Sequence, residues 1–90
     1  MTARALLSII IPTRNEEERL QRLLPQLGEL TPPPQIIVSD ADSSDQTRTV
    51  AARHGAIVIN KARGRGPQLN VGADAADGET LLFLHADSTL

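Results

Sequence analysis

The chain has 90 residues, a net charge of -2 and 22% charged residues, so we expect a single domain with no general affinity for nucleic acid. It contains no cysteine, which excludes disulfides and thiolate metal ligands. No apolar stretch reaches the length of a membrane span, and we expect a cytoplasmic protein, either free or at the cytoplasmic face of a membrane.

The first two predicted elements are a strand and a helix. Residues 5–11 are rich in β-branched residues and predict a buried strand that Pro12 ends. An amphipathic helix is expected over about residues 15–29, with Asn15 as its N-cap. Pro25 is a defect in this helix, so we expect a kink or an early end just before it.

The second pair of elements repeats this order. Residues 35–39 predict a strand that leads into an acidic, hydroxyl-rich turn. Ser43 or Ser44 can cap the helix that follows, which should run to His54. Gly55 is the expected left-handed stop of that helix.

The last part of the chain adds two strands and a helix between them. Residues 56–60 predict a strand, and residues 61–66 form a basic, glycine-containing loop before a helix that begins at Pro67. Residues 80–85 carry four consecutive large apolar residues without polar alternation. Such a run predicts a strand that is buried on both faces.

This alternation of strands and helices predicts an α/β fold with a four-stranded parallel sheet, flanking helices and right-handed crossovers. We expect the spatial order 3-2-1-4, because the most apolar strands, 5–11 and 80–85, should be neighbours. The carboxyl ends of all strands then lie along one edge of the sheet, here called the strand-end rim, where ligands bind. The segments expected at this rim are residues 12–14, 40–45, 61–66 and 85–87.

Charged side chains collect at the rim, and they suit a phosphorylated ligand with a divalent cation. His85 and Asp87 lie one residue apart after an extended strand, so both can reach one metal ion. Arg63 and Arg65 are suited to phosphate oxygens. Simpler interpretations stay open: Asp87 as a cap of the following turn, the arginines as a solvated loop, and Asp40 as a turn former.

Four ordered motifs resemble family-2 glycosyltransferases with the GT-A fold. The sequence Ser-Ile-Ile-Ile-Pro-Thr-Arg-Asn-Glu at residues 8–16 resembles their opening strand, and residues 37–47 are similar to their Val-Asp-Asp-Gly-Ser-x-Asp-Gly-Thr motif. Residues 63–72 look like their Asn-x-Gly helix, and residues 82–87 occupy the place of their Asp-x-Asp metal motif. The His-Ala-Asp form with the Arg-Gly-Arg loop looks most like the radical-SAM/selenodomain-associated transferase 2 subgroup.

This resemblance implies a nucleoside-diphosphate sugar donor, a divalent metal (Mn or Mg) and transfer of the sugar to an acceptor. By the same resemblance, Asp40 meets the uracil or ribose of the donor. Arg63 and Arg65 approach the base or diphosphate, and Asp87 with His85 binds the metal. The other nucleotide-binding residues that it implies are Pro12, Thr13, Arg14, Glu16 and Asn70.

The sequence departs from the family pattern at the rim and in length. Ala41 replaces the second aspartate of the usual pair, Asp42 stands where glycine is usual, and His85 replaces the first aspartate of the metal motif. The family's domain continues past that motif with its acceptor site and catalytic base. We therefore expect residues 1–90 to be the N-terminal nucleotide-sugar-binding part of such a domain, truncated after the metal motif, with no residue to nominate as the base and an unknown acceptor.

Other functions stay open at this point. A non-catalytic nucleotide-sugar binding module, or an inactive fragment, would bind donor without turnover. A nucleotidyltransferase normally carries a glycine-rich, lysine-containing loop where residues 12–15 stand, and a receiver-like domain carries an aspartate where Asn60 stands. We also expect the last strand to leave an open apolar edge through which the chain self-associates.

Overall fold

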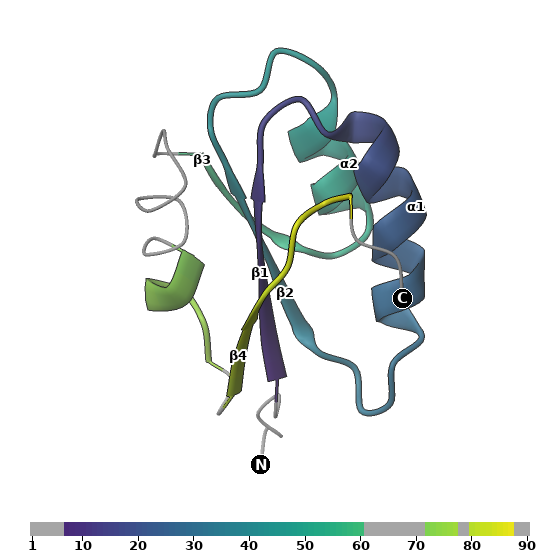
Figure 1. The fold of residues 1–90 in the computed structure, drawn as a ribbon, viewed down its shortest axis with the longest axis vertical. Helices are drawn as coiled ribbons and strands as arrows, with labels where there is room; N and C mark the ends of the chain where they lie inside the picture. Colours follow the sequence, from purple (N-terminus) through teal and green to yellow (C-terminus); the bar gives the residue numbers. More distant parts are fainter. Residues whose placement is uncertain (1–6, 61–71, 78–79, 88–90) are drawn as a thin grey trace.

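The computed structural model describes residues 7–60, 72–77 and 80–87. These residues form one four-stranded sheet in which every pair is parallel, with the order β3-β2-β1-β4 (Figure 1). This order is the one predicted from the sequence. The elements are β1 (Leu7–Thr13), α1 (Glu17–Gly28), β2 (Gln35–Asp40), α2 (Thr47–Arg53), β3 (Ile57–Asn60) and β4 (Thr80–Phe83).

The main core lies between the sheet and helices α1 and α2, which cover the same side of it in Figure 1. Ile9 and Ile11 of β1 and Val38 of β2 point to this side because alternate residues of a strand share a face. The helices meet them with buried residues at helical spacing, which are Leu20, Leu23, Leu24, Leu27, Val50 and Ala51. Ile10 points to the opposite side, where Gly72 lies against it.

Helix α1 differs from the sequence prediction at both ends. It begins at Glu17 rather than Asn15, whose φ of 54° is left-handed and not helical. It also continues through Pro25 to Gly28 instead of ending just before the proline. Leu24 and Leu27 are 2% and 1% exposed, so their packing against the sheet holds the last turn in place although Pro25 lacks an N–H to donate.

Strand β1 likewise passes through Pro12, where the sequence analysis placed its end. Pro12 is in register with Ser39, and the strand ends one residue later. The Ile10 carbonyl accepts a hydrogen bond from the Leu84 N–H at 3.0 Å, so the backbone polar groups of Ile10 are directed toward β4. Residues two positions apart in a strand are oriented alike, and the backbone nitrogen of Pro12, which carries no hydrogen, therefore also faces the β4 side. Pairing with β4 has ended at that level, and the proline therefore removes no ladder hydrogen bond there.

Strand β4 is where the burial prediction was wrong. It pairs with β1, but Leu81, Leu82 and Phe83 are 41%, 42% and 47% exposed instead of buried on both faces. The run of apolar residues identified the strand correctly. Its burial, however, depends on what covers the side of the strand that does not pair with β1, here called its second side. In the part of the chain that the structure describes, nothing pairs with that second side.

The second helix begins later than expected. It starts at Thr47, three or four residues after Ser43 and Ser44, and no side chain of its own N-cap residue caps it. Gly55 has a φ of 81°, which confirms the left-handed stop. No helix among the described residues combines the length and apolar character needed to cross a lipid bilayer.

Candidate functional site

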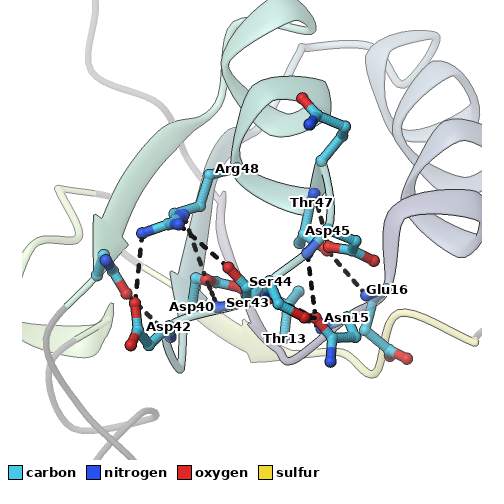
Figure 2. Close-up of polar contacts among 12 residues, drawn as sticks. Thr13, Asn15, Glu16, Asp40, Asp42, Ser43, Ser44, Asp45, Thr47 and Arg48 are labelled. Atoms are coloured by element: carbon cyan, nitrogen blue, oxygen red, sulfur yellow. Dashed lines mark hydrogen bonds and ion pairs between the residues drawn. The ribbon is translucent and has the colours of Figure 1, made fainter.

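Asp40 is the centre of a polar network at the strand-end rim, shown in Figure 2. Its side chain is fully buried at the end of β2, next to Thr13 at the end of β1. One carboxylate oxygen accepts hydrogen bonds from the hydroxyls of Thr13, at 2.6 Å, and Ser43, at 2.5 Å. The other accepts one from the Ser43 N–H at 2.8 Å. The carboxylate thus joins the two strand ends to the loop after β2.

The loop between β1 and α1 donates hydrogen bonds to the loop between β2 and α2. The Asn15 N–H reaches the Ser43 hydroxyl oxygen at 2.8 Å, and the Glu16 N–H reaches that of Thr47 at 2.9 Å. The Ser43 hydroxyl oxygen accepts this hydrogen bond from the Asn15 N–H and donates its own hydrogen to the Asp40 carboxylate. These bonds satisfy N–H groups at the start of α1 that have no partner within the helix.

The second loop donates hydrogen bonds back to the first. The Asn15 side-chain oxygen accepts from the N–H groups of Ser44, at 2.8 Å, and Asp45, at 3.4 Å. One Glu17 oxygen accepts from the Gln46 N–H at 3.0 Å. The sequence predicted Asn15 as the N-cap of α1, and this prediction was wrong. The left-handed backbone of Asn15 instead presents the side chain to the start of α2. We call the two loops, residues 14–16 and 41–46, the reciprocal clasp.

Asp45 links the starts of both helices. It accepts hydrogen bonds from the Thr47 hydroxyl, from the Thr47 N–H at 2.9 Å and from the Glu17 N–H at 3.4 Å. Burial acts to raise the pKa of this carboxyl, but the hydrogen bonds favour its ionised form and hold the pKa below the ordinary value. Asp45 is therefore an anion held at two helix N-termini, where the peptide dipoles also favour negative charge.

Arg48 is a rim residue that the sequence analysis did not identify. Its guanidinium lies 3.7 Å from an Asp40 oxygen and 3.8 Å from an Asp42 oxygen, and it donates to the Ser43 carbonyl at 3.1 Å. Asp42 has a left-handed φ of 54°, and its N–H donates to the Asn60 side chain at 2.9 Å.

The two residues predicted to bind the metal lie in the turn after β4. His85 and Asp87 are both exposed and flank Ala86, which is 2% exposed and packs in the core. A carboxylate and an imidazole suit Mn or Mg as two donors of a larger set. Among the described residues, no three His, Asp or Glu side chains come together as a metal site, so further ligands would have to come from elsewhere.

The other predicted binding residues are spread over the rim. Pro12 is half-buried, and Thr13 is buried with its hydroxyl on Asp40. Arg14 is exposed, and Glu16 forms an ion pair with Arg19 at 2.8 Å. The remaining predicted residues, Arg63, Arg65 and Asn70, lie outside the described residues.

A hollow in the surface is formed by part of the clasp and by the first turns of α1. It is lined by Asn15, Glu16, Glu17, Glu18, Arg19, Arg22 and Asp45. Its lining is mainly acidic, which would repel a phosphorylated ligand. We therefore place the candidate site at the strand ends, where Asp40, Arg48 and the turn after β4 lie.

The parallel sheet of order β3-β2-β1-β4, with helices beside it and polar loops at its rim, defines a Rossmann-like protein of the GT-A type. Residues 8–90 match the model of the family described as glycosyl transferase family 2, and the chain belongs to this family. It is 36% identical over 92 aligned residues to the 4,4'-diaponeurosporenoate glycosyltransferase of Staphylococcus haemolyticus. That match covers 93% of the chain and 24% of the relative, so the chain spans about a quarter of its length.

Solved structures show the same fold. Mannosyl-3-phosphoglycerate synthase from Rubrobacter xylanophilus superposes with a TM-score of 0.84 at 29% identity, over 96% of this chain and 32% of that one. Glucosyl-3-phosphoglycerate synthase from Mycobacterium tuberculosis gives 0.80 at 26% identity, over 92% and 34%. A further structure of the latter enzyme, at 24% identity and a TM-score of 0.79, over 91% and 33%, is a complex with Mn²⁺, uridine diphosphate and phosphoglyceric acid.

Proposed function

We propose that this chain is the donor-binding part of a glycosyltransferase that transfers a sugar from a nucleoside diphosphate to an acceptor. The observation that carries the proposal is the family match over residues 8–90, which includes every motif at the strand-end rim. The fold supports it, because ligands of open parallel sheets bind beyond the carboxyl ends of the strands. The matched relative is about four times as long as this chain. In this proposal the transferase activity therefore belongs to the complete protein.

In this proposal the nucleoside lies over the ends of β1 and β2. Asp40 holds the reciprocal clasp in shape, and a direct contact with the nucleoside would require the fully buried carboxylate to become accessible to the ligand. Arg63 and Arg65 approach the base or diphosphate. The radical-SAM-associated subgroup, self-association through β4 and a cytoplasmic location stay predictions.

Asp87 and His85 hold the divalent metal in this proposal. Their exposure leaves them accessible to a diphosphate, which would supply the missing ligands. The metal would stabilise charge on the departing nucleoside diphosphate. The Mn²⁺ and uridine diphosphate bound by the mycobacterial synthase support this role through the shared fold.

The test is nucleotide binding by the complete protein, measured by calorimetry in chelator, in magnesium and in manganese. Wild type should bind uridine or guanosine diphosphate only with metal, and more tightly with manganese because of the imidazole. Asp87→Asn should remove the metal dependence, and His85→Asp should shift the preference toward magnesium. Glu18→Gln, on the exposed face of α1, is the control. Equal binding in all three conditions would contradict the metal role.

Donor binding and sugar transfer must be measured separately. Hydrolysis or transfer from a nucleoside-diphosphate sugar would support the transferase function. Tight, metal-dependent binding without turnover by the complete protein would instead support a binding module. We propose no acceptor, because none of the described residues can be assigned to an acceptor site.

A further inference from the structure

Arg48 occupies a central position at the rim that neither the family motifs nor the metal motif explains. It extends from the first turn of α2 over the loop after β2, as Figure 2 shows. It contacts the Asp40 carboxylate at the end of β2, and the Asp42 carboxylate and Ser43 carbonyl in the loop that follows. Its side chain is 38% exposed, so the guanidinium also faces solvent at the rim.

The charges around Arg48 are not equivalent. Asp40 is fully buried and has three hydrogen bonds besides the ion pair, so its charge is well compensated inside the protein. The Asp42 side chain is 63% exposed on a left-handed backbone, at the edge of the rim. Removing the guanidinium would take one positive charge from beside the exposed Asp42 carboxylate, and the ends of β2 and β3 would be more negative toward an approaching anion. The Coulomb energy would then disfavour a diphosphate much more than a neutral nucleoside.

We infer that Arg48 is a positioning residue of the donor site, which makes this acidic end of the rim acceptable to an anionic nucleotide. It does so mainly by offsetting the charge of the exposed Asp42, and by donating a hydrogen bond to the Ser43 carbonyl in the loop after β2. The inference rests on the proposed function, because it presupposes that the rim binds a nucleoside diphosphate. Arg48 needs no contact with the ligand to act in this way.

A purely structural role for Arg48 predicts a different pattern of effects. If the residue only stabilised the loop, its loss would weaken the binding of charged and neutral ligands by the same factor, at every salt concentration. An electrostatic positioning role affects the diphosphate selectively. The effect then declines as salt screens the exposed charges.

The experiment compares wild type, Arg48→Gln and Arg48→Lys of the complete protein. The probes are uridine diphosphate and uridine, or guanosine diphosphate and guanosine if the wild type binds only these. Arg22→Gln is the matched control, since Arg22 is 77% exposed on α1 and pairs with Glu18 only at 4.0 Å. Affinities are measured at low and high salt in saturating manganese, with the free energy of unfolding of each variant alongside.

Arg48→Gln should weaken diphosphate binding by roughly three- to tenfold at low salt, the effect of one partly exposed charge. Nucleoside binding should change by less than about twofold, and the difference should shrink as salt screens the charge. Arg48→Lys should keep most of the affinity. Adding Asp42→Asn to Arg48→Gln should restore diphosphate binding, because asparagine tolerates the left-handed backbone and removes one negative charge from the same end of the rim.

Equal loss for nucleoside and diphosphate, or no loss for either, would overturn the inference while leaving donor binding intact. A folded wild-type protein that binds no nucleoside diphosphate would overturn the proposed function first. The two failures are therefore distinguishable. If Arg48→Gln does not fold, the Lys variant and the double variant with Asp42→Asn decide the question.

Discussion

Replacing Asp40 with alanine should destabilise the protein even without a ligand. The substitution removes the acceptor of three hydrogen bonds, from the hydroxyls of Thr13 and Ser43 and from the Ser43 N–H, and leaves Arg48 without its buried partner. Three buried donors left without their acceptor together cost about 3–5 kcal/mol, at the low end of about 1–3 kcal/mol for each, and the ion pair adds little because the Arg48 side chain is 38% exposed. We expect Asp40→Ala to lower the free energy of unfolding by that amount, measured by denaturant titration.

Two comparisons make this prediction sharp. Glu18→Ala removes a carboxylate whose side chain is 84% exposed, and it should change stability by less than about 0.5 kcal/mol. Asp40→Asn keeps one carbonyl oxygen for the hydroxyls of Thr13 and Ser43 but loses the charge, and should fall between the two. A loss below about 1 kcal/mol for Asp40→Ala would refute the reasoning. Such a small loss of stability, combined with weaker nucleotide binding by Asp40→Ala, would support a direct contact between Asp40 and the donor.

Three further results follow from the described residues. Gly72→Ala places a Cβ 2.4 Å from Ile10 Cγ2, and should cost roughly 1–3 kcal/mol in denaturant titration; Gly28→Ala, with no atom within 4 Å, should not. Asp45 has a lowered pKa in the folded state, so its contribution to stability is present above its ordinary pKa of 3.8 and is lost as the pH falls through the folded value. In a plot of the free energy of unfolding against pH, Asp45→Asn should therefore reduce the slope in this acidic range. Phe83→Lys, on the exposed face of β4, should reduce any self-association seen by sedimentation, whereas unchanged association would exclude this edge.

The strand order could be predicted because alternation along the chain and right-handed crossovers leave few arrangements. Burial could not be predicted equally well. Ile9, Ile10 and Ile11 in β1 and Leu81, Leu82 and Phe83 in β4 are similar apolar runs, yet the first are fully buried and the second are more than 40% exposed. An apolar run identifies a strand, but it does not report how many neighbours the strand has.

The clasp was missed for a different reason. Helix caps were predicted from residues next to each helix, whereas in the structure the start of each helix also forms hydrogen bonds with residues at the start of the other helix. Asn15 and Ser44 are 29 positions apart in sequence, and Glu16 and Thr47 are 31 apart. The residue types were informative, since Asn, Ser and Thr favour such roles. Their partners depend on the parallel pairing of β1 with β2, which brings both loops to one rim.

The two halves of the candidate site therefore differ in how they should respond to mutation. Side chains of the clasp are tied to one another and to the buried Asp40, so changes there alter stability and ligand binding together. His85 and Asp87 are exposed on either side of Ala86, which packs in the core. Asp87→Asn should leave the free energy of unfolding within about 0.5 kcal/mol of wild type while it alters metal-dependent binding. A large loss of stability in that variant would mean that Asp87 is a structural cap and not a metal ligand.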